Sequence, residues 1–333
     1  MKQFISRLVR FSLIGIILSL VLFSSYFYFD PFKVLRHYND YSYSYVIPNR
    51  DYISTTMFMS NYKNKSYNSF ILGSSRTLAF KPNSWRKYLS DNDNPFVFDA
   101  SNESIYGIYT KLKYLDSTNV EIKNALIILC RDVSFNYTEN HKGHLFIKHP
   151  ATSGESNLAF QFEFFKAYLS PKFPFNFYSY KILGTYMPFM AGYIDRRKIT
   201  FDTITNEINI IDQETEITEN PAEYYAKRRD LFYERIGEKT DSIQGITNKH
   251  LFLLKEIRRI LEKNNTNYKV VLSPLYDQTK FNPSDLLLLK IEFGNNLYDF
   301  SGKNSFTDNK MNYYETNHYR PNIGDSILKR IYK

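Results

Sequence analysis

Two short segments at opposite ends of the chain contain side chains that could perform nucleophilic chemistry. Ser75 follows a short apolar run and a glycine at residues 70–73, and Glu315 precedes His318 by three positions near the C-terminus. A serine hydroxyl needs a neighbouring base to become a useful nucleophile, and a carboxylate can hold that base in the right tautomer. The two segments therefore contain the side chains of a Ser–His–acid arrangement.

Each segment alone also has an ordinary structural interpretation. A Gly-Ser-Ser turn is common without any chemistry, and His318 in its polar loop could simply be a surface histidine. The position of Ser75 after an apolar run is informative, because open parallel sheets build their sites at the carboxyl ends of strands. Gly73 allows a sharp turn there, and a helix start beyond it could direct backbone N–H groups at an anion.

The elements needed to bring these segments together can be read from the apolar pattern. Short apolar runs alternate with segments of helical spacing, which predicts an α/β fold with a parallel sheet flanked by helices. The run 125–130 is apolar throughout, as expected of a strand covered on both faces. The predicted strands are 70–72, 96–98, 125–130, 268–272 and 297–300, and the predicted helices are 83–89, 105–115, 251–261, one beginning at 283, and 321–331.

The same pattern divides the chain. Residues 1–30 form a membrane anchor, 31–66 a polar, Tyr-rich connector, and 67–333 the α/β domain. The alternation is interrupted at about 136–247, which we interpret as a mostly helical or irregular insertion in which Asn220, Pro221 and Glu223 mark one helix start. This insertion could be a lid or substrate platform, or structural padding.

Residues 11–29 contain no charged side chain. A helix of this length spans roughly 28 Å, about the thickness of a bilayer core. A buried core helix and a cleaved signal peptide are the alternatives, but no clear small-x-small site follows the run. Basic residues precede the run, which favours an uncleaved anchor with the large domain outside the cytoplasm, although Lys33 and Arg36 also flank the far side.

Together, the strand-Gly-Ser-Ser segment and the Glu-x-x-His segment resemble the first and last blocks of the SGNH/GDSL hydrolase superfamily. Ser74 stands where the family has aspartate, Ser75 at the nucleophile, and Glu315 at the aspartate of the last block. The similarity covers about 68–135 and 265–333. More narrowly, the sequence resembles membrane-anchored envelope members, such as the D-alanyl transfer protein of teichoic acid modification and the alginate acetylation proteins. This resemblance implies a flavodoxin-like three-layer α/β fold.

The resemblance also implies residues that stabilise an oxyanion or bind substrate. By position, Asn102 best matches the second block, where the family normally has glycine, and Arg131 stands where the third block has asparagine. Arg131 could equally be a salt-bridging residue. Arg76, next to the nucleophile, is a further candidate. These departures from the middle blocks of the family count more against ordinary esterase activity than against the predicted fold.

Other sites are less well supported. The formal net charge is +9, but Lys and Arg are interleaved with Asp and Glu, so a negatively charged envelope surface is a more natural partner than nucleic acid. His141, His144 and His149 are clustered but have no carboxylate at a metalloprotease spacing, so we expect a polar loop without metal. The single cysteine, Cys130, excludes an internal disulfide. No cofactor is expected.

The resemblance thus predicts serine-dependent acyl transfer or acyl-ester hydrolysis on a cell-envelope glycan. It also suggests a membrane-bound acyltransferase as a partner. The alternative is a non-catalytic envelope protein that binds glycan or assists assembly while keeping the fold.

Overall fold

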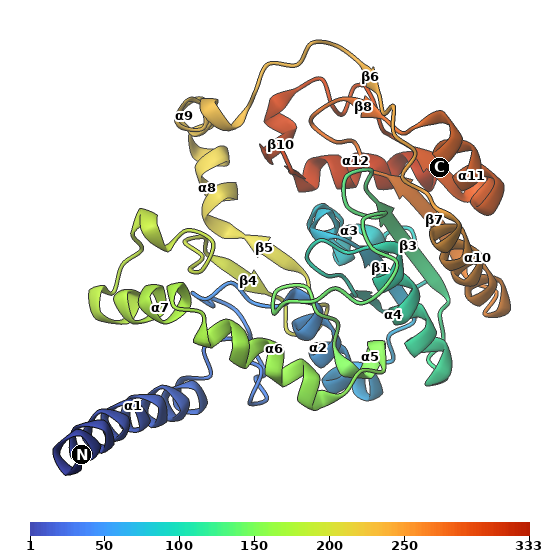
Figure 1. Ribbon diagram of the computed structural model, residues 1–333. Helices are drawn as coiled ribbons and strands as arrows, with labels where there is room; N and C mark the ends of the chain where they lie inside the picture. Colours follow the sequence, from blue (N-terminus) through green and yellow to red (C-terminus); the bar gives the residue numbers. More distant parts are fainter.

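A five-stranded parallel sheet forms the centre of the molecule. The computed structural model describes residues 1–333, leaving aside the side chain of Lys2. The sheet order is β2-β1-β3-β7-β9, and every neighbouring pair is parallel (Figure 1). The predicted α/β class is confirmed, and each predicted strand lies within one residue of its observed bounds. These are β1 (Ser69–Gly73), β2 (Pro95–Val97), β3 (Asn124–Leu129), β7 (Asn267–Leu272) and β9 (Leu297–Asp299).

Helices cover both faces of this sheet. Successive strand side chains point to opposite faces, so Phe70 and Leu72 face one apolar layer whereas Ile71 faces the other. The first layer contains α2 (Arg50–Lys65), α4 (Ile105–Ser117), α10 (Asn248–Lys263) and α11 (Pro283–Phe293). The second contains the 3₁₀ helix η1 (Ser75–Ala79), α3 (Pro82–Arg86) and α12 (Pro321–Ile331).

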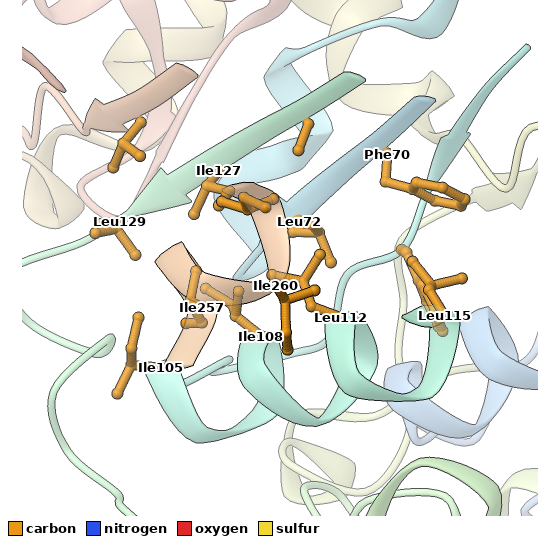
Figure 2. Packing of buried hydrophobic residues seen from close by; sticks show 14 of the residues in the cluster. Phe70, Leu72, Ile105, Ile108, Leu112, Leu115, Ile127, Leu129, Ile257 and Ile260 are labelled. Carbon is orange, nitrogen blue, oxygen red and sulfur yellow. The ribbon is translucent and has the colours of Figure 1, made fainter. Parts of the chain in front are cut away.

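Helix α4 shows how the sequence pattern produces the packing. Its apolar residues recur at three- and four-residue intervals, so they form one stripe that faces the sheet. Figure 2 shows this stripe with α10 side chains against the strands, and all the labelled residues are buried. Complete burial of each such side chain contributes roughly 1.5–3 kcal/mol. The α4 stripe consists of Ile105, Ile108, Leu112 and Leu115.

The segment expected to be a polar connector, 31–66, requires a correction. Its second half forms the 16-residue helix α2, and Ile53, Met57 and Phe58 of this helix lie in the main core. The polar residues that suggested a connector include Asp51 and Arg50, which are themselves buried because they form ion pairs inside the domain. The α/β unit therefore includes α2.

The insertion has its own small elements. Asn220 caps α9 by accepting the Glu223 N–H at 3.2 Å, which confirms the predicted helix start. The β4–β5 hairpin is antiparallel, and β6 pairs in parallel with β8, which follows β7. The elements of the insertion are α5 (Pro150–Ser153), α6 (Asn157–Leu169), α7 (Lys172–Leu183), β4 (Ile199–Phe201), β5 (Ile208–Ile210), α8 (Ile211–Glu219), α9 (Pro221–Lys227) and β6 (Lys239–Thr240). The partner of β6, β8 (Thr279–Lys280), lies outside the insertion.

The N-terminal helix α1 (Lys2–Phe29) projects from the rest of the molecule (Figure 1). Between Gln3 and Phe29 it is long and apolar enough to cross a membrane, with mean hydropathy 2.1 in its most apolar window, and that window is not buried against the protein. It ends at Asp30, whose buried carboxylate accepts N–H groups of the following turn, including that of Val34 at 2.9 Å. The predicted apolar span lies within this longer helix.

Candidate active site

Ser75 is presented at the carboxyl end of β1. Gly73, the last residue of β1, has φ 147°, and a Cβ there would lie 2.5 Å from the carbonyl oxygen of Ile128 on β3, so only glycine fits. The next turn, η1, begins at Ser75. Every residue from Tyr67 to Phe80 is buried except Ser75, which is half-buried. The local fold therefore exposes this one serine.

A short hairpin supplies the other two side chains. The strands β10 (Tyr313–Glu315) and β11 (His318–Tyr319) are antiparallel, and Glu315 pairs with His318 across them. This pairing explains how a Glu-x-x-His spacing places the Glu315 and His318 side chains next to each other. The second oxygen of Glu315 accepts the Asn317 N–H at 2.6 Å, which fixes the carboxylate in the turn.

The structure brings the three predicted side chains together although 243 positions separate the serine from the histidine. Ser75 Oγ lies 2.7 Å from His318 Nε2, and His318 Nδ1 is hydrogen-bonded to Glu315 Oε1. With the Nδ1–H donating to the carboxylate, Nε2 is left to accept the serine proton. This is the order of contacts that activates a serine nucleophile.

The electrostatics keep Glu315 ionised. Burial alone would raise the pKa of Glu315, but hydrogen bonds from His318 and the Asn317 N–H outweigh burial and hold this pKa below its usual range. The side chains of His318 and Glu315 are 20% and 27% exposed, so solvent or substrate can reach the pair. The carboxylate can therefore stabilise a positive charge on His318 at neutral pH.

Arg76 holds the hairpin in place. Its buried guanidinium donates from Nε to the Asn317 carbonyl at 2.9 Å and also pairs with Asp132, which follows β3. We expected Arg76 to bind an oxyanion or substrate. In this structure its contacts tie the Glu-Thr-Asn-His turn to the end of the sheet.

The other two residues that we expected to bind an oxyanion or substrate, Arg131 and Asn102, differ in their contacts. Arg131 is paired with both Asp241, at 2.7 Å, and Asp277, so it has the salt-bridging role that the sequence left open. Asn102 lies in the turn after β2 with φ 53°, and its half-buried side chain makes no hydrogen bond within the described part of the chain. The Ala100 N–H donates to the Gly73 carbonyl at 3.2 Å, which places this turn beside the end of β1.

Part of the insertion supports the hairpin, a role that sequence reasoning missed. Tyr224 and Tyr225 of α9 donate from their hydroxyls to the carbonyls of Tyr314 and Tyr313, at 2.9 and 2.8 Å. On α8, Glu214 pairs with Arg320 at 2.8 Å, just beyond β11. The α9 start was readable from Asn220, but nothing in the sequence indicated what α9 packs against.

A buried ion-pair network supports the nucleophile turn from the other side. Asp99, at the end of β2, accepts the Thr77 hydroxyl of η1 at 3.0 Å and pairs with Arg50 of α2 at 2.8 Å. Next to it, Lys111 pairs with Asp51 and Glu103 at 3.0 and 2.7 Å, and Lys148 pairs with the same two carboxylates. All six charged side chains are at most 5% exposed. The η1 turn is therefore joined through Thr77 to a buried charge network whose members come from three separate segments.

The clustered histidines have structural contacts of their own. His149 caps α5 by accepting the Ala151 N–H on Nδ1 at 3.0 Å, and the His144 ring packs against the rings of Phe32 and Phe164. Among the described residues, no group of three or more His, Cys, Asp or Glu side chains is arranged to hold a metal ion. Burial lowers the pKa of His149 and of His144, so both rings are neutral at neutral pH.

These neutral histidines predict a pH dependence of stability. Because the folded-state pKa of His149 is lowered, the unfolded chain binds the extra proton first, so the free energy of unfolding should begin to fall as the pH drops below about 6.5. Replacing His149 with Asn keeps a capping oxygen without a titrating ring and should reduce this fall. Urea unfolding between pH 5 and 8 measures it, and an equal fall in both proteins would contradict the assignment.

Comparison with known proteins gives no family for this chain. No protein-family model matches the sequence, and no curated protein matches it significantly. The functional assignment therefore depends on the geometry of Ser75, His318 and Glu315, on the way the fold positions them, and on the apolar helix that precedes the domain.

Proposed function

We propose that this protein is a membrane-anchored serine acyltransferase or esterase of the SGNH/GDSL type that acts on a cell-envelope glycan outside the cytoplasm. The observation that carries the proposal is the contact of Ser75 Oγ with His318 Nε2 at 2.7 Å, with Glu315 bonded to the other ring nitrogen. The five-stranded parallel sheet and the position of Ser75 at the end of β1 fit that superfamily.

The proposed reaction has two halves. Ser75 Oγ attacks the acyl carbonyl while its proton passes to His318 Nε2, and the same proton then leaves with the departing alcohol or carrier group. In the second half, His318 takes a proton from a glycan hydroxyl or from water as this oxygen attacks the acyl–serine ester. The proton then passes from His318 to Ser75 Oγ as the ester bond breaks, which regenerates the free serine. The Ser75 N–H and Asn102 are the proposed donors to the tetrahedral oxyanion. A membrane-bound acyltransferase would supply the acyl group.

A test of the reaction uses the purified full-length chain in lipid nanodiscs, with an activated acetyl ester and an envelope glycan preparation. We expect ester consumption with a transient acetyl group on Ser75, found by peptide mass spectrometry. Acetyl groups that appear on the glycan indicate a transferase, and free acetate alone indicates an esterase. Absence of both turnover and acetyl-Ser75 would contradict the proposal.

The second candidate function is a non-catalytic glycan-binding or assembly protein. The observation that favours it is the pairing of Arg131 with Asp241 and Asp277, because these two carboxylates neutralise the cation that stands where the third block of the family has asparagine. This candidate predicts that the glycan is retained by the chain with no acetyl-Ser75 formed. The same nanodisc experiment therefore separates the two functions.

A further inference from the structure

The helix α6 has two apolar faces, and the second is only partly covered by the rest of the protein. Phe160, Phe164 and Tyr168 recur every four residues and are buried in a cluster with the chain that follows α1. Leu158, Phe162, Phe165 and Leu169 form a second stripe at i, i+4, i+7 and i+11. Within that stripe Leu158 and Phe162 are 83% and 61% exposed. An amphipathic helix in water needs only the first stripe.

Helix α7 and the turn after it also have exposed apolar side chains. Phe175 and Ile182 are 64% and 82% exposed, and Leu183 and Phe189 are also exposed. Exposed apolar side chains scattered singly need no explanation, but several of them on two consecutive helices indicate a surface that interacts with a membrane or another molecule. We refer to residues 157–190, which contain both helices, as the α6–α7 unit.

The α6–α7 unit is joined to the helix that can cross the membrane. The Phe165 ring contacts the rings of Phe23 and Tyr26 on α1, with centroids 5.8 and 5.3 Å apart, and Ser25 is hydrogen-bonded to Tyr168. Farther along α1, Leu169 and Phe165 line an apolar groove of about 840 Å³ together with α1 residues from Ser12 to Phe23. In Figure 1 α6 and α7 lie on the side of the domain from which α1 projects.

The contact with Phe23 indicates how far below a membrane surface the α6–α7 unit would lie. Phe23 is six residues before the end of α1 at Phe29, which corresponds to about 9 Å along the helix axis. If α1 crosses a bilayer up to Phe29, the C-terminal end of α6 must lie below the membrane surface by a comparable amount. Helices that lie in the interface bury their apolar face by roughly 5–10 Å.

The charges of the unit fit the same environment. Residues 157–190 contain three lysines, Lys166, Lys172 and Lys181, and one acidic residue, Glu163. A basic excess beside exposed Phe, Leu and Ile side chains is typical of helices that bind the headgroup region of anionic bilayers. We infer that the α6–α7 unit is a membrane-interface element that lies half-embedded in the leaflet at the Phe29 end of α1 and holds the catalytic domain against the bilayer.

Spin labels on single cysteines test this inference in the full-length chain in nanodiscs of phosphatidylcholine and phosphatidylglycerol. The native Cys130 is fully buried, so unmodified protein measures the labelling background. Labels at F162C and I182C report on the unit. A label at I17C on α1 is the lipid reference, and one at I243C, at a position 75% exposed and outside the unit, is the water reference.

We expect oxygen to collide with the Phe162 and Ile182 labels more often than a water-soluble nickel complex does, as at Ile17, with the ratio reversed at Ile243. Labels at 162 and 182 that behave like the one at 243 would overturn the inference, as would a water-exposed label at 17. If the labels at 162 and 182 were shielded from the nickel complex in native membranes but not in nanodiscs, a protein partner would cover the unit. That result would also overturn the inference. The Ser75→Ala chain should give the same ratios, so this result is independent of catalysis.

Discussion

The Ser75→Ala variant is expected to abolish acyl modification of the envelope glycan while the protein remains folded. Ser75 is half-buried in a turn, so losing its hydroxyl should change the free energy of unfolding by about 1 kcal/mol or less. The chemical loss should be on the order of a thousand-fold or more, because the hydroxyl is the attacking atom. The measurement is glycan acyl content in cells that contain each variant at matched protein level.

The structure supplies matched controls for this result. Ser74 is fully buried, 3.5 Å from the Cys130 sulfur, so its hydroxyl cannot reach a substrate, and Ser74→Ala should retain modification. His318→Ala should resemble Ser75→Ala, and the double variant should be no worse than either, because members of such a group act as a unit. Wild-type modification by Ser75→Ala would remove the catalytic interpretation and leave the binding-protein alternative.

The second large effect is expected on stability, from the buried network. Replacing Asp51 with Ala leaves Lys111 and Lys148 with Glu103 as their only shared carboxylate, and it also removes the acceptor of the His149 N–H. An uncompensated buried charge of this kind typically costs about 3–5 kcal/mol. Urea unfolding of the full-length chain at pH 7 should show this loss in the Asp51→Ala variant.

Two further variants separate the charge from other effects of the substitution. Glu238 pairs with Lys280 at the surface, with both side chains more than a third exposed, so Glu238→Ala should cost about 1 kcal/mol or less. The Asp51→Asn/Lys148→Met double variant removes one charge of each sign and should be more stable than Asp51→Asn alone. A double variant as unstable as the sum of its single variants would contradict the network.

The stability that this network contributes also depends on pH. Burial would raise the pKa of Asp51, but the charges of Lys111 and Lys148 outweigh burial and hold this pKa well below its usual range. Because the folded-state pKa is lowered, the stability from Asp51 is present above about pH 4 and is lost as the pH falls through the folded value. This loss of stability occurs at a lower pH than the loss of stability expected from protonation of His149.

Much of the central fold could be predicted because its strands are apolar and its helices are periodic. The run 125–130 had to be a doubly covered strand, and the apolar spacing of 321–331 gave α12 with its observed bounds. Helix α2 was missed because its pattern mixes core residues with Arg50 and Asp51, whose burial depends on partners far away in the sequence. Local periodicity carries no information about such pairs.

The candidate site could be predicted where a reactive residue type also stands at an informative position in the sequence. Ser75 follows a strand, and Glu315 and His318 have a spacing that a hairpin brings together. The roles of Arg76 and Arg131 could not be read in this way, because a guanidinium near a site is equally suited to an anionic substrate or to Asp132 and Asp277. Only the three-dimensional arrangement decides between these partners.

The most direct measurement of the central claim is the reaction of the purified full-length protein with a fluorophosphonate probe, which modifies activated serines. We predict a single adduct on the peptide that contains Ser75, a large loss of labelling in His318→Ala, and normal labelling in Ser74→Ala, because only Ser75 contacts the imidazole. A folded wild-type protein that does not react at Ser75, or that reacts equally well without His318, would contradict the account.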